Sequence, residues 1–215
     1  MYGPAGTSYS TSKEQAQTNT ADSDIKGVVD AWYKTNIADK GYGNAVSDTI
    51  FCNDRSTPGK EVTGWSDDTG LGYGKNATAY GAKARIVLGF SGPSFRCFQK
   101  NDAFTVNDTN KGNGALTYPI GLITIDEIVA AGVGMDGTAN TSYYLYNPSA
   151  WSWTMTPATF NNDIAFIFTA NIYGSYDSHF SLPGGGTASP VINLSAEYVK
   201  NMSGTGTMTD PYQAL

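Results

Sequence analysis

The sequence is poor in the residues on which most hydrolases and metal sites depend. It contains one histidine, His179, and two cysteines, Cys52 and Cys97, in 215 residues. A structural zinc site takes four cysteine or histidine ligands, and no Gly-x-Ser-x-Gly segment places a nucleophile near His179. The glycine-rich stretch 70–74 lacks the Gly-Lys-Ser/Thr ending of a phosphate-binding loop. We therefore expect no metal ion, no cofactor and no enzymatic activity.

Positive charge is also scarce. The net charge is −6, and no lysine or arginine occurs between Lys111 and Lys200. Nucleic-acid binding requires clustered basic residues, so we expect no nucleic-acid partner. No apolar run approaches the ~20 residues of a membrane span, which argues against direct membrane insertion. The first six residues lack the basic and apolar regions of a signal peptide, and we expect a targeting segment to be missing from this sequence.

The two cysteines leave several alternatives open from the sequence alone. They could be a pair of buried thiols, a disulfide, or half of a metal site. An even cysteine count in a chain of secreted-like composition favours a Cys52–Cys97 disulfide, with two free thiols as the alternative. Such a bridge would stabilise the fold by about 4 kcal/mol. We accordingly expect an extracellular or cell-surface protein, with a phage particle as a further possible location.

The chain divides into a lead-in and one domain. Residues 1–21 are polar and lack periodic apolar positions, whereas residues 22–215 carry the material for a core. Apolar residues at helical spacing follow Ser23, and Gly41 ends the run. This pattern predicts a helix whose Trp32 and Tyr33 anchor the core.

The rest of the domain reads as one short helix and a series of strands. Thr124 and Glu127 form a capping-box pattern before a helix that should stop at Gly132. Together, the predicted elements indicate an α+β domain with two helices, a mainly antiparallel twisted sheet and long loops. The predicted strands are 49–52, 84–89, 95–98, 104–106, 142–146, 151–156, 164–170 and 190–194.

Residues 157–196 have an unusual composition. This stretch has no Lys, Glu, Gln, Met or Trp, although these types make up 27 of the 215 residues. Every residue type that is present can be written by a codon ending in C or T, and the five missing types cannot. A glycine-rich hairpin without long side chains is one interpretation. The other is a stretch diversified at asparagine-type codons by mutation of adenines only.

The side chains in this stretch resemble those of an antibody paratope. Aromatic rings supply rigid contact area, and Asn, Ser, Asp and Gly supply adaptable hydrogen bonds. We predict a variable ligand-binding region at about 157–189, with aromatic or ring side chains as anchors and amide or carboxylate groups as polar selectors. The predicted anchors are Tyr173, Tyr176, His179 and Phe180, and the predicted selectors are Asn161, Asp163, Asn171 and Asp177.

Several motifs, taken in order, resemble a known family. They are the segments 121–127, 151–157, 165–168 and 190–195 and a Gly-Ser turn at 174–175. In these segments the chain resembles the C-terminal half of bacterial C-type-lectin-fold domains. These include the formylglycine-generating-enzyme-like subgroup and the variable proteins of diversity-generating retroelements.

The resemblance implies a C-type lectin-like fold that binds a ligand and does not catalyse. Many relatives carry an arginine where this chain has Ser189, and the copper-binding cysteines of formylglycine-generating enzymes lie near the end of their domain, unlike Cys52 and Cys97. The implied partner is a protein or glycan on another cell or particle. The alternative is a structural subunit of a bacterial surface or phage-tail structure, which sedimentation would reveal as concentration-dependent self-association.

Overall fold

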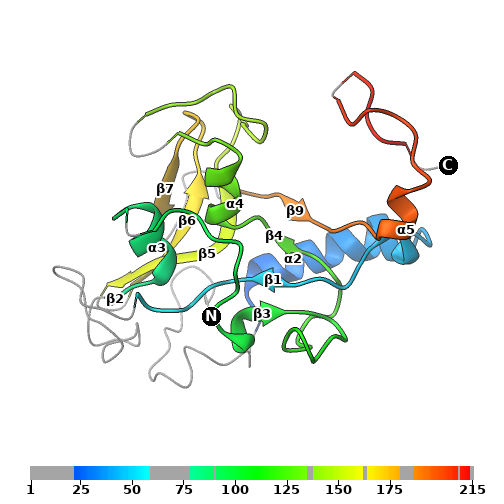
Figure 1. Ribbon diagram of the computed structural model, residues 1–215, viewed down its shortest axis with the longest axis horizontal. Helices are drawn as coiled ribbons and strands as arrows, with labels where there is room; N and C mark the ends of the chain where they lie inside the picture. Colours follow the sequence, from blue (N-terminus) through cyan, green and yellow to red (C-terminus); the bar gives the residue numbers. More distant parts are fainter. Residues whose placement is uncertain are drawn as a thin grey trace.

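The computed structural model describes residues 22–58, 78–89, 91–134, 138–161, 164–179, 186–207 and 209–213. The predicted lead-in, residues 1–21, lies outside these ranges. Within them the protein is a mixed α+β structure with short helices, one larger sheet and two small ones, joined by long loops (Figure 1). The predicted α+β class is thereby confirmed.

The first described helix, α2 (Asp24–Tyr33), begins where the sequence predicts. The Ser23 side chain accepts a hydrogen bond from the Lys26 N–H, which satisfies a free donor of the first turn. A π-helical turn, η1 (Lys34–Ala38), continues it. Val29 and Tyr33 are buried on the same helix face. Trp32 is 39% exposed beside the 59% exposed Val28, so the prediction that Trp32 anchors the core is wrong.

The second predicted helix is confirmed as α4 (Ile125–Ala130). Its capping box is complete, because Thr124 accepts from the Glu127 N–H while the Glu127 carboxylate accepts from the Thr124 N–H. Asp126 lies in the first turn of α4, where its carboxylate complements the free N–H groups.

Two further helices are present. Residues 84–89, predicted as a strand, overlap α3 (Gly81–Ile86), and α5 (Ala196–Val199) follows the last strands. In α3, Ala82 and Ile86 are four residues apart, so they lie on the same helix face, and both are buried. Ala, Lys and Arg in this segment also have high helix propensity. The strand was predicted from the apolar composition of 84–89 alone, without the four-residue spacing that indicates a helix.

The larger sheet runs in the order β2-β5-β6-β7, and all of these pairings are antiparallel. The predicted strand 164–170 is confirmed as β6, and strand β5 is longer than predicted. Strand β8 pairs in parallel with the beginning of β5. The bounds are β2 (Thr78–Ala79), β5 (Ser152–Asn161), β6 (Ile164–Ala170), β7 (Tyr176–His179) and β8 (Thr187–Ala188).

Two small antiparallel sheets lie between the larger sheet and α2 in the view of Figure 1. They pair β1 with β3 and β4 with β9. The bounds are β1 (Phe51–Cys52), β3 (Ala103–Phe104), β4 (Gly121–Leu122) and β9 (Pro190–Val191), with 3₁₀ turns η2 (Gly43–Ala45) and η4 (Lys100–Asp102) nearby. Strands β1, β3 and β9 lie within or overlap predicted strands but are shorter, whereas no strand was predicted at β4.

Besides 84–89, two more predicted strands do not form. Residues 95–98 are irregular, and residues 142–146 are turns. In the second segment Tyr143 is 6% exposed and Tyr144 is 88% exposed, an alternation that imitates a strand. The Tyr146 hydroxyl donates to the Ile172 carbonyl at 3.0 Å, which fastens this loop to the β6–β7 connection. Tertiary contacts therefore override the β propensity of the three tyrosines.

The core has two clusters, one on each face of β5. Alternate residues of a strand face opposite ways. Ala158 belongs to the cluster with α3 and α4, which contains Ile125, Ile128 and Phe168. Trp153 and Met155 of β5 instead pack toward a second cluster built on α2, whose buried members are Val29, Tyr33, Ile120 and Leu122. Strand β5 is thus the central layer of the domain.

A carboxylate organises the long loop after β3. The Asp48 oxygens accept hydrogen bonds from the main-chain N–H groups of Val106, Asn107 and Asp108 at 2.7, 2.7 and 3.0 Å. Partial burial opposes ionisation of Asp48, but these three bonds outweigh it and lower its pKa.

We expect Asp48→Ala to lower the free energy of unfolding at pH 7 by about 1 kcal/mol, at the low end for such bonds because the carboxylate is partly solvated. Because the folded pKa is lowered, the stabilisation is present above the unfolded value of about 3.9 and is lost as pH falls through the folded value. Denaturant unfolding of the wild type and of Asp48→Ala at pH 7 and at about pH 3 measures this. If the two proteins differ in free energy of unfolding by the same amount at both pH values, the role of the Asp48 charge is contradicted.

Candidate functional site

Part of the predicted binding region lies in the β6–β7 connection. The turn is held by the Asn171 side chain: its Oδ1 accepts hydrogen bonds from the main-chain N–H groups of Tyr173 and Ser175, each at 3.0 Å, and its Nδ2 donates to the Ser175 hydroxyl. Gly174 adopts φ +79°, and a Cβ there would lie 2.6 Å from the Asn140 carbonyl oxygen. Only glycine fits this close approach, so the predicted turn at 174–175 is confirmed.

Three ring side chains and a carboxylate gather beside this turn. The Trp151 ring meets the His179 ring edge-on at 4.8 Å between centroids and the Tyr173 ring edge-on at 6.4 Å. His179 Nε2 lies 3.2 Å from an Asp177 carboxylate oxygen. Tyr173 is 63% exposed and the Asp177 side chain 53% exposed. We call Trp151, Tyr173, Asp177 and His179 the hairpin surface.

Trp151 is absent from the ligand contacts predicted from the sequence, yet its ring contacts the rings of both Tyr173 and His179. The signal that could have found it is its place immediately before β5 and two residues before Trp153, because alternate residues of an extended chain point to the same side. Trp153 packs against the α2 cluster. Trp151 precedes the first residue of β5, so its ring lies at the end of the sheet.

Two predicted ligand contacts are buried instead. Asn171 is 6% exposed and is engaged in the turn, and Tyr176 is 8% exposed. The Tyr176 ring packs edge-on against Phe168 at 5.9 Å, inside the α3–α4 cluster. The prediction that these side chains contact a ligand is therefore corrected: both support the hairpin from within. The composition of a paratope does not distinguish rings that face solvent from rings that face the core.

The remaining predicted contacts lie outside the described residues, wholly or in part. Asp163 and Phe180 are outside the ranges given above. Asn161 ends β5, where its backbone pairs with Ile164, and its side chain is outside the described part.

Lys83 of α3 lies within electrostatic reach of Asp177. Burial lowers the pKa of Lys83, while the negative charge of Asp177 opposes that shift. The hairpin surface therefore combines aromatic contact area with the Asp177 carboxylate, whose negative charge acts on the Lys83 ammonium group of α3. Such a surface can stack on apolar or sugar faces and can accept hydrogen bonds at Asp177.

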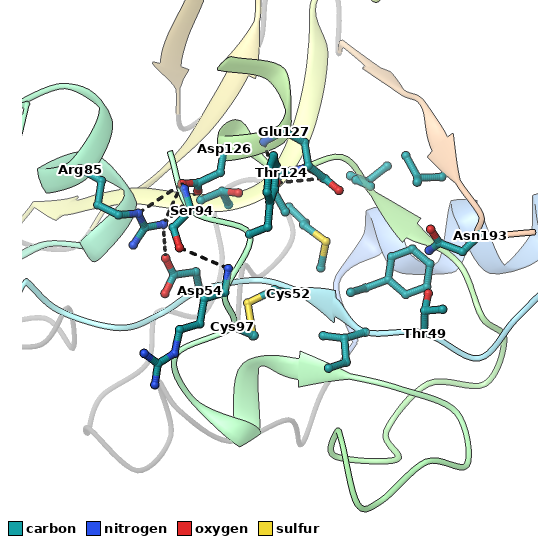
Figure 2. Close-up of a pocket in the computed structure, with 18 residues that line it drawn as sticks. Thr49, Cys52, Asp54, Arg85, Ser94, Cys97, Thr124, Asp126, Glu127 and Asn193 are labelled. Carbon is teal, nitrogen blue, oxygen red and sulfur yellow. Dashed lines mark hydrogen bonds and ion pairs between the residues drawn. A yellow bond between two sulfur atoms is a disulfide. The ribbon is translucent and has the colours of Figure 1, made fainter. Parts of the chain in front are cut away.

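A separate pocket lies between the two small sheets and the beginning of α4 (Figure 2). Its volume is about 220 Å³. Apolar walls come from Phe51, Leu122, Met155 and Val191, and the disulfide closes one side. Polar side chains also line the pocket, and they belong to Thr49, Asp54, Arg85, Ser94, Arg96, Thr124, Asp126, Glu127 and Asn193.

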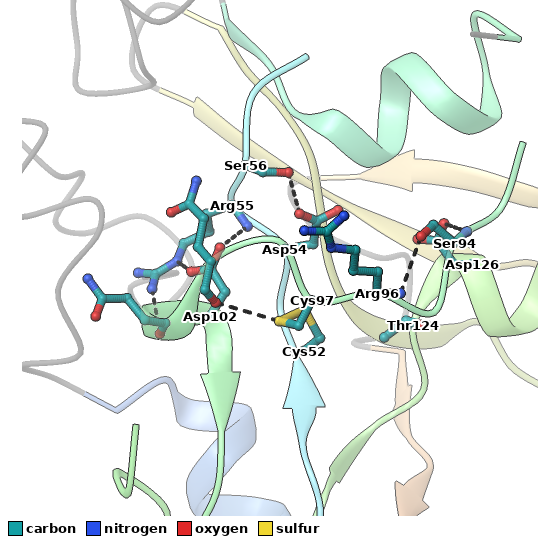
Figure 3. The surroundings of a disulfide bond; sticks show 12 residues. Cys52, Asp54, Arg55, Ser56, Ser94, Arg96, Cys97, Asp102, Thr124 and Asp126 are labelled. Carbon is teal, nitrogen blue, oxygen red and sulfur yellow. Dashed lines mark hydrogen bonds and ion pairs between the residues drawn. A yellow bond between two sulfur atoms is a disulfide. The ribbon is translucent and has the colours of Figure 1, made fainter. Parts of the chain in front are cut away.

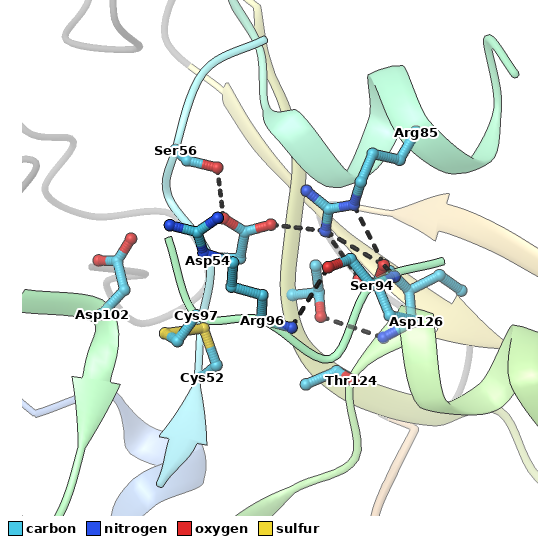
Figure 4. A network of polar contacts seen from close by, with 12 residues as sticks. Cys52, Asp54, Ser56, Arg85, Ser94, Arg96, Cys97, Asp102, Thr124 and Asp126 are labelled. Atoms are coloured by element: carbon cyan, nitrogen blue, oxygen red, sulfur yellow. Dashed lines mark hydrogen bonds and ion pairs between the residues drawn. A yellow bond between two sulfur atoms is a disulfide. The ribbon is translucent and has the colours of Figure 1, made fainter. Parts of the chain in front are cut away.

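A buried ion network forms one wall of this pocket (Figure 4). Arg85 lies 2.7 Å from an Asp54 oxygen and 2.9 Å from an Asp126 oxygen, and all three side chains are at most 9% exposed. Burial disfavours the Arg85 charge, but the hydrogen bonds and charges of the two aspartates outweigh it and raise the pKa of Arg85. Asp54 has φ +38°, a left-handed conformation that aspartate tolerates better than most residues.

Cys52 and Cys97 form a disulfide that fastens the irregular segment 91–99 to β1 (Figure 3). The structure thus contains the bridge that the cysteine count favours. Beside it, Arg55 Nε lies 2.6 Å from an Asp102 oxygen, with both side chains buried. Burial raises the pKa of Asp102, and the Arg55 charge opposes this shift only in part. The disulfide and the two buried ion pairs of Arg85 line the pocket, and the buried Arg55–Asp102 pair lies beside the disulfide.

Comparisons with protein-family models, curated proteins and solved structures found no match to the chain. Within the described residues, no helix has the length and apolar character needed to cross a bilayer. Across the same ranges, no three His, Cys, Asp or Glu side chains are grouped as a metal ion would require.

Proposed function

We propose that this protein is a non-catalytic ligand-binding module whose hairpin surface contacts a protein on another cell or particle. The observation that carries the proposal is the cluster in which the exposed Tyr173 and Asp177 lie beside the partly exposed rings of Trp151 and His179. Aromatic rings on a rigid support supply large contact areas at low entropic cost, and they are enriched among residues that dominate binding energy.

The support beneath this surface favours recognition without large rearrangement. Asn171 fixes the turn through hydrogen bonds at both of its amide atoms, and Tyr176 anchors β7 in the core. A surface that is ordered before binding loses less conformational entropy when it binds. This arrangement suits a scaffold that keeps its buried positions fixed while exposed positions vary.

The proposal extends to a C-type lectin-like fold, to diversification of residues 157–189, and to an extracellular or cell-surface location. The order of the sequence motifs supports the first, and the composition of 157–196 supports the second. The disulfide supports the third, because such bonds persist mainly in oxidising compartments.

We expect Tyr173→Ala with Asp177→Ala to reduce ligand capture at least tenfold, because the double variant removes the most exposed ring and the carboxylate of the hairpin surface. Immobilised wild type and variant would be compared for capture from envelope fractions of neighbouring cells, followed by affinity measurement on the captured protein. Loss of capture after deglycosylation of the fractions would assign the ligand to glycans instead.

Tyr42→Ala is the matched control, because Tyr42 is 53% exposed and lies outside the hairpin surface. It should leave capture unchanged, and both variants should unfold within about 1 kcal/mol of wild type. Equal capture by the double variant and the wild type would refute the assignment of the hairpin surface as the ligand contact.

A further inference from the structure

The pocket is bordered by two chain segments that pair and then separate. Val46 and Leu194 form an antiparallel bridge, and the Ser47 N–H donates to the Asn193 carbonyl at 2.8 Å. Beyond this point the segments diverge, so residues 49–52 line the pocket opposite Val191 and Asn193. Among the residues that the structure describes, no strand pairs with the edge of β1 that faces away from β3.

The register of β1 on β3 shows which main-chain groups face that edge. The Asn53 N–H donates to the Asp102 carbonyl at 3.1 Å, so residues 53 and 102 form a hydrogen-bonded pair. Such pairs alternate along an antiparallel ladder. Phe51 and Phe104 are therefore the next hydrogen-bonded pair, and Cys52 turns its N–H and C=O groups away from β3.

The partner strand agrees with this alternation. The Ala103 carbonyl, opposite Cys52, accepts from the Asn113 N–H at 2.8 Å on the far side of β3. By the same alternation the main chain of Ile50 also faces the pocket. Among the residues that the structure describes, no hydrogen bond engages the Ile50 main chain. Residues 50 and 52 thus present donors and acceptors at the two-residue spacing that an added strand requires.

The walls of the pocket indicate what such a strand would carry. Phe51, Leu122 and Met155 offer an apolar wall for one side chain. The carboxylates of Asp54, Asp126 and Glu127 outnumber the guanidinium groups of Arg85 and Arg96, which leaves a formal excess of negative charge. Phe95, on the same lining, is 74% exposed and offers a ring face to a cation.

We propose that this pocket binds an extended peptide that adds as a strand to the free edge of β1, with an apolar side chain in the pocket and basic residues beside it. The site is distinct from the hairpin surface and does not depend on its function. Main-chain bonds to residues 50 and 52 supply the alignment, and the excess carboxylate charge selects a basic sequence over an acidic one.

The test uses the whole chain and a fluorescein-labelled octapeptide of alternating valine and lysine, blocked at both ends. Two further peptides carry N-methyl groups either on every valine or on every lysine. Because the N–H groups of alternate residues point to opposite edges of a strand, one N-methyl pattern should weaken binding at least tenfold while the other changes it by less than about threefold. The valine–glutamate octapeptide should bind at least tenfold more weakly than the valine–lysine peptide.

Amide hydrogen exchange followed by NMR locates the peptide. Saturation with the valine–lysine peptide should slow exchange of the Ile50 and Cys52 amides at least tenfold, and Tyr173→Ala with Asp177→Ala should leave its affinity unchanged. Absence of binding at 1 mM peptide, equal weakening by both N-methyl patterns, equal affinity for the acidic peptide, or protection confined to the hairpin surface would each overturn the proposal.

Discussion

Replacing Arg85 by methionine should destabilise the protein by about 3–5 kcal/mol, because it leaves two buried carboxylates without their counter-charge. Asp54 and Asp126 have side chains only 6% and 5% exposed, and both are ion-paired to Arg85. Methionine fills much of the same volume, so the loss reports mainly the charge and its hydrogen bonds. Denaturant unfolding at pH 7, followed by tryptophan fluorescence, measures the change.

Lys111→Met is the matched control for this substitution. It removes a cation paired to Asp108, but the Lys111 side chain is 76% exposed, and solvent screens exposed pairs so that they contribute little to stability. Adding Asp54→Asn and Asp126→Asn to Arg85→Met should recover part of the lost stability, since the uncompensated charges are then removed. A loss below 1 kcal/mol for Arg85→Met alone would show that the network is dispensable.

Removing the disulfide with Cys52→Ala and Cys97→Ala should lower the free energy of unfolding by about 4 kcal/mol. The bridge spans 45 residues, and closing a loop of that length restricts the unfolded chain by about this amount. The wild type unfolded in the presence of a reducing agent should lose the same stability as the double variant. Thermal and denaturant unfolding, each with and without reductant, give the comparison.

Two outcomes separate this account from its alternatives. If reductant changes the unfolding of wild type but not of the double variant, the bridge is the cause of the difference. If reductant leaves wild type unchanged while iodoacetamide labels both cysteines without it, the thiols are free and the bridge does not form in solution.

Local signals predicted the parts of the fold that depend on local chemistry. Ser23 and the Thr124–Glu127 box cap helices where expected, because a side chain that satisfies a free N–H group acts within one turn. Strand β6 matches its predicted bounds, because a run of β-branched and aromatic residues bounded by turns has few alternatives.

What the sequence could not reveal depends on contacts between distant residues. Arg85 meets Asp126 across 41 positions, and nothing in the spacing of either residue indicates the pair. Trp32 and Tyr33 are adjacent aromatic residues, yet only Tyr33 is inside, because the side of α2 that packs is set by its neighbours in space. The same holds in the binding region, where Tyr173 is exposed and Tyr176 is buried.

The most direct test of the central claim, a binding surface that is diversified on a fixed scaffold, is to sequence the gene and its surroundings in the source genome. The account predicts a second, nearly identical copy of the DNA encoding residues 157–196, differing only at positions where the copy carries adenine. A genome with a single copy of this segment would contradict diversification.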